Sequence, residues 1–360
     1  MWSELELIDR SEPMHPPPLA HERLASMAPG LDELCGSVAE HLRRQPGFDD
    51  ASTVFPAENM WNNLEIRRFL RREETAEEAW PEADEPVASS LERHIPFLIN
   101  FQLHRRKTFW VDESLAYMLS KTDLDLTGGE LRAPFPCFAM VFTDRYTLSL
   151  AERMLSLDGQ CPIAGHFLKV ATAFVVEDGS DSNRSLRVGF ALDALGADPP
   201  YLVTYEVPLT KEAPLRRFLD ELAPRVTTYP QVPDSDPHRR LFHILFNAIL
   251  YATSAGVDPQ LRPSPAAASR PGPRPTAEKA VLSSENVYFL PDAIEITRVR
   301  ELQKLERVSS GREILHRFMV RGHWRRAAPG WKNQRVRWIG PYWKGPDIAA
   351  VIERTYKLKP

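Results

Sequence analysis

The feature that most constrains the fold is a proline-rich segment in the last third of the chain. Six prolines fall within residues 259–275, and Ala, Ser and Arg fill most of the other positions. Proline fixes φ and lacks a backbone N–H, so this segment suits neither a helix nor a central strand. We therefore expect an extended or disordered linker over residues 258–280, which separates the sequence before it from a C-terminal module.

The overall composition is that of a globular protein. The chain has 360 residues, of which 43% are apolar and 26% are charged, enough for a core and for about two domains. No run approaches the roughly 18 apolar residues of a membrane span, and the N-terminus lacks the apolar stretch of a signal peptide. Three widely spaced cysteines predict no disulfide framework. We expect a cytoplasmic protein.

Hydrophobic spacing changes character near residue 134. Before it, apolar residues recur at helical intervals in residues 19–27, 31–44, 58–72 and 87–121. After it, short runs rich in aromatic and β-branched residues predict strands over 134–144, 167–177, 185–192, 201–207 and 286–290. Residues 210–222 and 238–255 are expected to form helices, and the second is the most apolar of the chain.

These elements predict an α+β protein in four parts. Residues 1–130 form a helical N-terminal region, and residues 131–257 form a central domain with a small, mostly antiparallel sheet and a long core helix. The linker over 258–280 follows. Residues 281–360 form a basic, Arg- and Trp-rich module that contains a β-hairpin.

Charge is distributed unevenly along the chain. Residues 312–360 contain 12 Lys/Arg and 3 Asp/Glu, a net charge of +9, whereas the remaining residues carry a net charge of −13. The same 49 residues hold four of the eight tryptophans. A basic, aromatic-rich end on an acidic body indicates contact with a polyanion or with an acidic surface.

Alternation within this end predicts a two-faced hairpin with its turn at residues 327–330. Arg317, Arg321, Arg335 and Arg337 would share one face, and Phe318, Val320, Val336 and Trp338 the other. Guanidinium groups bind phosphates and indoles stack on unpaired bases. The candidate RNA- or ribosome-binding residues are Arg317, Arg321, His323, Trp324, Arg325, Arg335, Arg337 and Trp338. Two other interpretations stay open: an acidic protein partner, or a structural ribbon packed on the acidic body.

The sequence predicts no catalytic residue, metal ligand or cofactor site. His316 and His323 lack the further ligands of a zinc site, and Cys161 and His166 have no orienting group nearby. No phosphate-binding glycine loop and no hydrolase motif is present. A divergent metal-dependent nuclease that uses carboxylates such as Asp292 and Glu295 remains an alternative.

Two C-terminal motifs carry a family resemblance. Arg321-Gly322-His323-Trp324, followed by Arg335-Val336-Arg337-Trp338, resembles the end of a family of phage, plasmid and other mobile-element proteins that includes a type V-A anti-CRISPR protein. The Phe135-Pro136-Cys137-Phe138 strand and the apolar helix over 241–251 occur in matching order. The likeness covers roughly residues 130–345, by order and character more than by identity.

The resemblance implies a regulatory binding protein and not an enzyme. By this likeness, the chain would lower production of a target protein by engaging its nascent chain, its message or the ribosome. The implied partners are RNA or the ribosome and the nascent target polypeptide. The resemblance assigns no peptide-binding residues.

Overall fold

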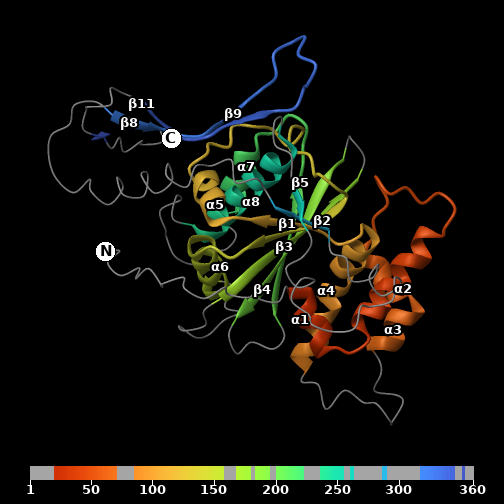
Figure 1. The fold of residues 1–360 in the computed structure, drawn as a ribbon. Coiled ribbons are helices and arrows are strands. Elements are labelled where there is room, and N and C mark those ends of the chain that lie inside the picture. Colours follow the sequence, from red (N-terminus) through yellow and green to blue (C-terminus); the bar gives the residue numbers. More distant parts are fainter. Residues whose placement is uncertain are drawn as a thin grey trace.

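The centre of the molecule is a mixed seven-stranded sheet with helices on both faces (Figure 1). The computed structural model describes residues 20–70, 85–157, 168–179, 183–194, 200–222, 236–254, 260–262, 286–289, 317–344 and 351–352. No helix in these ranges is long and apolar enough to span a membrane. The α+β class predicted from the sequence is confirmed.

The sheet has the strand order β5-β4-β3-β2-β1-β7-β6. Its strands are β1 (Lys107–Val111), β2 (Cys137–Phe142), β3 (Leu168–Asp178), β4 (Ser185–Ala194), β5 (Tyr201–Pro208), β6 (Gln260–Arg262) and β7 (Asn286–Phe289). β1 runs parallel to both β2 and β7, and the other neighbouring strands are antiparallel. The sheet is mostly antiparallel, as predicted, but it is larger than the small sheet we expect from the sequence.

The helices occur in two groups along the chain. The first group is α1 (Ala20–Met27), α2 (Leu31–Arg43), a 3₁₀ turn η1 (Ala57–Asn62), α3 (Leu64–Leu70) and α4 (Glu85–Leu103). The second group is α5 (Glu113–Ser120), α6 (Arg145–Leu157), α7 (Leu215–Leu222) and α8 (Pro237–Thr253). Figure 1 shows α1 to α4 gathered beside one face of the sheet and α5, α7 and α8 on the other.

Strand β1 corrects the prediction of helix through residue 121. Helix α4 ends at Leu103, and the backbone φ angles of Arg105 and Arg106 are 61° and 51°. This left-handed conformation ends a helix and redirects the chain. The following segment, Lys107–Val111, is rich in β-branched and aromatic residues, which favour strands. It lies between β2 and β7, inside the sheet.

Alternate side chains of β2 pack into two different cores, one on each face of the sheet. Phe138, Met140 and Phe142 belong to the core under α8, whereas Cys137 and Ala139 belong to the core under α1, α2 and α4. Side chains on successive strand residues point to opposite faces, so β2 needs apolar residues at every position. All six residues of β2 are buried. Burial raises the pKa of the Cys137 and Cys35 thiols, which are free.

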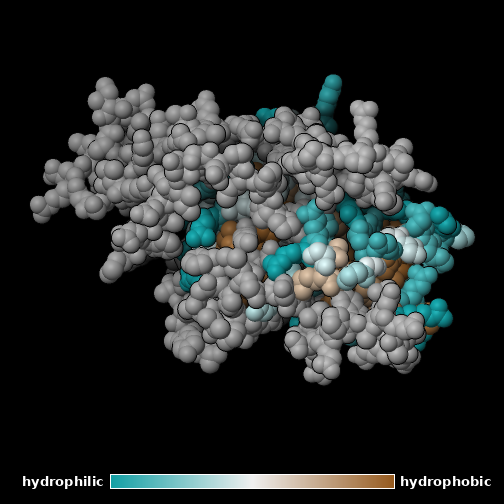
Figure 2. All heavy atoms as spheres, turned by 60° about the horizontal axis from the view of Figure 1, so that its bottom comes forward, coloured by the Kyte–Doolittle hydropathy of each residue, from teal (hydrophilic) through white to brown (hydrophobic). Residues whose placement is uncertain are grey.

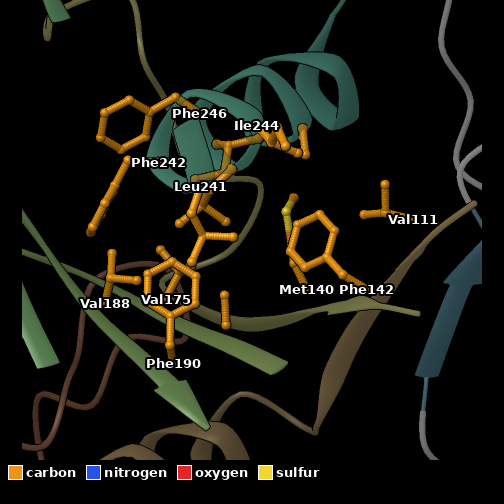
Figure 3. Close-up of a cluster of buried hydrophobic side chains, with 14 of the residues drawn as sticks. Val111, Met140, Phe142, Val175, Val188, Phe190, Leu241, Phe242, Ile244 and Phe246 are labelled. Atoms are coloured by element: carbon orange, nitrogen blue, oxygen red, sulfur yellow. The ribbon is translucent and has the colours of Figure 1, made fainter. Parts of the chain in front are cut away.

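Helix α8 crosses the first of these cores (Figure 3). Phe242 meets Phe190 of β4 edge-to-face with 5.4 Å between ring centroids, a favourable aromatic geometry. The helix starts at Asp236, whose carboxylate accepts hydrogen bonds from the backbone N–H groups of His238 (2.8 Å) and Arg239 (3.2 Å). Pro237 occupies the first turn. The helix is apolar on nearly all sides because it is covered by the sheet below and by the C-terminal segment above.

Only a short part of the predicted linker is described. β6 forms the edge of the sheet between Pro259 and Pro263, a position that tolerates flanking prolines. Residues 263–285 lie outside the described residues. The domain boundaries at 130 and 258 stay predictions, although β1 and β7 bring both flanking parts into the central sheet. On the face of the molecule shown in Figure 2, the visible described residues are mostly hydrophilic, and apolar ones lie in recesses between them.

Candidate nucleic-acid interface

The C-terminal segment forms a two-stranded ribbon, which we define as residues 317–344. β8 (Arg317–Val320) pairs with β11 (Tyr342–Lys344), and β9 (His323–Arg325) pairs with β10 (Arg337–Ile339), both antiparallel. The two ladders keep one register, from Phe318 opposite Lys344 to Arg325 opposite Arg337. A short strand β12 (Val351–Ile352) adds to β8 in parallel. The ribbon lies over the α8 side of the sheet, and the loop beyond β9 projects away from it (Figure 1).

At Gly322, the backbone of the ribbon forms hydrogen bonds with the body and not with the opposite ribbon strand. The N–H of Asp123 donates to the carbonyl of Gly322 (2.7 Å), and the N–H of Gly322 donates to the carbonyl of Lys121 (3.2 Å). The ring of Pro341 packs close to Gly322, and proline has no N–H for a ladder. A Cβ atom at position 322 would lie 2.5 Å from the Thr122 hydroxyl oxygen. Glycine is therefore required here by close approach of the two backbones.

Two tryptophans anchor the inner face of the ribbon. Trp324 is only 8% exposed, and its Nε1–H donates to Oδ1 of Asn247 on α8 at 2.7 Å. Trp338, its cross-strand partner, donates from Nε1 to the Thr122 hydroxyl at 3.1 Å. The Trp338 ring meets Tyr251 edge-on, with 5.1 Å between centroids. Both indoles thus combine apolar packing with a satisfied polar tip.

A buried polar network supports these anchors from below. The carbonyl of Thr122 accepts hydrogen bonds from Nε2 of His243 (2.7 Å) and Nδ2 of Asn247 (3.3 Å). A carbonyl can only accept, so the proton of His243 lies on Nε2. Burial lowers the pKa of His243, which favours this neutral form. The network therefore holds the ribbon without a buried charge on this histidine.

Two ribbon arginines are neutralised by the body. Arg321 pairs with Asp123 (3.3 Å), and Arg326 binds Glu130 through Nε (2.5 Å) and Nη2 (2.9 Å). Partial burial raises the pKa of Glu130, but hydrogen bonds from Arg326 and from Thr127 outweigh this and leave that pKa below its usual value. Glu130 is therefore ionised at neutral pH. These pairs place two basic side chains of the ribbon against carboxylates of the body.

The outer face carries charge that the described body does not neutralise. Arg325 and Arg337 lie directly opposite each other in the ladder. Their guanidinium carbons lie 5.3 and 5.9 Å from the centre of the Trp331 ring, which is 39% exposed. Among the described residues, no carboxylate lies within ion-pair distance of Arg325, Lys332, Arg335 or Arg337. Like charges opposite each other are unfavourable, and an anion bound between them would relieve this repulsion.

Two hollows flank Arg335. The first has a volume of about 280 Å³ and is lined by Trp331, Lys332, Asn333, Arg335 and Arg337. The second, which we call the cleft, has a volume of about 570 Å³ and lies between the ribbon, the 129–134 loop and the end of α8. Its walls include Arg132, Pro134, Arg326, Gln334, Arg335 and Val336. Arg335 is common to both hollows.

The structure separates the sequence-predicted site residues into groups. Arg321, His323, Arg325, Arg335 and Arg337 are exposed, whereas Trp324 and Trp338 are turned inward as anchors. Among the described side chains, Arg321, Arg335 and Arg337 are exposed and Val336 and Trp338 are half-buried, as the predicted alternation requires. The strands pair as 323–325 with 337–339 and 317–320 with 342–344. The side chain of Arg317 lies outside the described ones.

Three residues that form or support the ribbon surface are not among the residues predicted from the sequence. Trp331 is one of the four tryptophans of the basic end. Its position in the sequence between Arg325 and Arg337 could have marked it as a candidate contact residue. Asn247 and Thr122 carry no such signal, because they are distant in sequence and isolated polar residues. Cys161, His166, Asp292, Glu295 and His316 lie outside the described residues. Within the described ranges, no group of three or more His, Cys, Asp or Glu could hold a metal ion.

The comparisons with known proteins find a likeness in structure but none in sequence families. No family model matches the chain, and no curated protein matches it. Among solved structures, the chain is similar to one titled "Crystal structure of AcrVA2", with 14% sequence identity and a TM-score of 0.46. The alignment covers 89% of this chain and 95% of that chain.

Proposed function

We propose that this chain is a regulatory RNA-binding protein that contacts RNA through the outer face of its ribbon. The observation that carries the proposal is the pairing of Arg325 and Arg337 across the ladder, against the exposed ring of Trp331. Guanidinium groups bind phosphate oxygens with two parallel hydrogen bonds, and exposed indoles stack on unpaired bases. Lys332 and Arg335 extend the same positive surface.

The anchored inner face supports this role. Trp324 and Trp338 fix the ribbon to α8 and to Thr122, so the outer arginines are held in place before a ligand arrives. A site that is already ordered loses less conformational entropy on binding. Arg321 and Arg326, which pair with body carboxylates, belong to this support and not to the contact surface.

The sequence resemblance gives the proposal its biological direction. An anti-CRISPR-like protein of a mobile element would use this surface on the ribosome or on a message to lower production of its target. The nascent target polypeptide would then be a second partner, and its contact residues remain unassigned. The location would be cytoplasmic, where translation occurs.

Ribosome co-sedimentation from cell lysate over a salt series tests the proposal. The informative variant is Arg325→Gln/Arg337→Gln, which removes two charges from the outer face. Its matched control is Arg44→Gln/Arg68→Gln, which removes two exposed charges on the other side of the sheet, one at the residue that follows α2 and one on α3. We expect the wild type and the control to travel with ribosomes at low salt and the ribbon variant to stay at the top of the gradient.

A second candidate function is supported by the inner face alone. The Trp324–Asn247 and Arg326–Glu130 contacts are what a purely structural basic tail would make. This candidate predicts that the wild type, too, stays at the top of the gradient at low salt. That result would overturn the RNA-binding proposal.

A further inference from the structure

The two hollows beside the ribbon form a path with a charged step between them. The smaller hollow lies against the Trp331 ring, the cleft lies toward the 129–134 loop, and Arg335 borders both. A chain that runs from one hollow to the other along this shared border passes Arg335. In nucleic acids, a phosphate separates each base from the next, so the alternation of hollow, cation and hollow matches that repeat.

The cleft has the size and lining of a nucleotide site. Its volume of about 570 Å³ lies within the roughly 300–1,000 Å³ of small-molecule sites. Ala133, Pro134 and Val336 offer apolar surface. The amide nitrogen of Gln334 donates to the carbonyl of Trp331, which leaves its amide oxygen to accept from a base edge. A base enters such a hollow only when it is unpaired, because the edges and faces of bases in a duplex are already occupied.

The charges of the cleft locate the phosphate on the Arg335 side. Glu130 also borders the cleft and would repel a phosphate, but Arg326 engages its carboxylate through two nitrogen atoms. Arg335 has no carboxylate partner among the described residues. Of the three arginines that border the cleft, Arg132, Arg326 and Arg335, only Arg335 also borders the Trp331 hollow, away from the Glu130 pair.

We infer that the ligand of this surface is single-stranded RNA, with one base stacked on Trp331, the next nucleotide in the cleft and the phosphate between them on Arg335. The inference rests on the proposed function and narrows it from RNA in general to unpaired RNA. Stacking does not depend strongly on base identity, so the site selects strandedness more than sequence.

Fluorescence anisotropy with the full-length protein tests the inference. The probes are a labelled 12-nucleotide single-stranded RNA of mixed sequence and the blunt duplex of the same sequence, at one fixed salt concentration. We expect the wild type to bind the single strand at least about tenfold more tightly than the duplex. Trp331→Ala should weaken single-strand binding about 5- to 100-fold and leave duplex binding unchanged, since base–aromatic stacking has this strength.

Two further variants address the rest of the path. Arg335→Gln should weaken single-strand binding, whereas Arg68→Gln, an exposed charge on α3, should not. Ala327→Leu, which adds bulk to a half-exposed wall of the cleft, should weaken single-strand binding more than duplex binding. The control for Trp331→Ala is Leu64→Ala, which also removes an exposed apolar side chain, at a residue that is 51% exposed. It should leave single-strand binding unchanged.

The outcomes distinguish this inference from the function on which it rests. Equal binding of the two probes, weakened by Arg325→Gln/Arg337→Gln but not by Trp331→Ala, would overturn the inference and keep the RNA-binding proposal. Failure of the wild type to bind either probe at low salt would overturn both. A single-strand preference that is lost in Trp331→Ala supports both.

Discussion

The indole of Trp324 donates its proton to the side-chain oxygen of Asn247 at 2.7 Å, across the boundary between the ribbon and helix α8. The tryptophan lies in the C-terminal ribbon, and the asparagine lies on α8, which crosses the core. Both side chains are buried, so neither can exchange this partner for water. This bond makes the ribbon a part of the core and not an appended tail.

Loss of that donor should be costly for stability. Trp324→Phe keeps an aromatic ring but leaves Oδ1 of Asn247 without a donor, and a buried unpaired acceptor costs about 1–3 kcal/mol. Urea unfolding measures the change. Because the two residues share one bond, the double variant Trp324→Phe/Asn247→Leu should lose less stability than the sum of the two single variants. Strict additivity would contradict the assigned coupling.

Gly322→Ala should loosen the ribbon from the body. The new Cβ would meet the Thr122 hydroxyl oxygen at 2.5 Å and Cδ of Pro341 at 2.9 Å. Overpacking of this kind costs about 1–3 kcal/mol. The expected result is a lower unfolding midpoint together with faster hydrogen exchange of the Asp123 amide, which bonds to the carbonyl of Gly322.

Gly36→Ala is the matched control, and its effect should have the opposite sign. Gly36 lies inside α2, and a Cβ there meets nothing within 4 Å. Alanine in a helix interior is more stable than glycine by roughly 0.5–1 kcal/mol. If both alanine substitutions lower stability equally, the steric account of Gly322 is wrong.

The Glu130–Arg326 pair should stabilise the ribbon only above acidic pH. The pKa of Glu130 is lower in the folded protein than in the unfolded chain, where glutamate titrates near about 4.3. Its stabilising contribution is therefore present above that value and is lost as the pH falls through the folded pKa. Glu130→Gln should be less stable than the wild type at pH 7, and the difference should shrink as the pH falls below the unfolded pKa and vanish below the folded one. Because Arg326 is more than half exposed, the effect should shrink at high salt.

Asp144, which precedes α6, should show the reverse dependence. Burial raises its pKa, the carboxylate of Glu113 raises it further, and hydrogen bonds from Thr147 oppose both effects only in part. The folded state thus favours the protonated form, so stability is lost as the pH rises through the folded pKa. Asp144→Asn, which keeps an acceptor for the Thr147 amide, should be more stable than the wild type at pH 7. Glu206→Gln, at an exposed carboxylate on β5, should change little at any pH.

The sequence predicts the central strands and helices well because local patterns determine them. β3, β4 and β5 lie within two residues of their predicted ends, as alternation and turn signals separate them clearly. Helix α8 is marked by the largely apolar run from Leu241 to Ala252. β1 is missed because its five residues follow a strongly helical run, and only the backbone conformation of Arg105 and Arg106 ends that run.

Long-range pairing is not encoded in such local patterns. β1 pairs with β7, about 180 residues later, and no short-range signal specifies that partner. In the ribbon, alternation predicts the described side chains correctly, but the contact between Gly322 and Thr122 joins segments about 200 residues apart and has no local signal. For the same reason, the sequence groups Trp324 and Trp338 with the candidate RNA contacts. In the structure their partners Asn247 and Thr122, which are distant in the sequence, hold the two indoles inward.

The salt dependence of RNA binding tests the central claim most directly. The claim is that Arg325 and Arg337 bind phosphates, and each phosphate contact to a single strand contributes about 0.7 to the slope of log K against log salt. Arg325→Gln/Arg337→Gln should reduce the magnitude of that slope by about 1.4 relative to the wild type, while Arg44→Gln/Arg68→Gln leaves it unchanged. An unchanged affinity and slope in the ribbon variant would contradict the account.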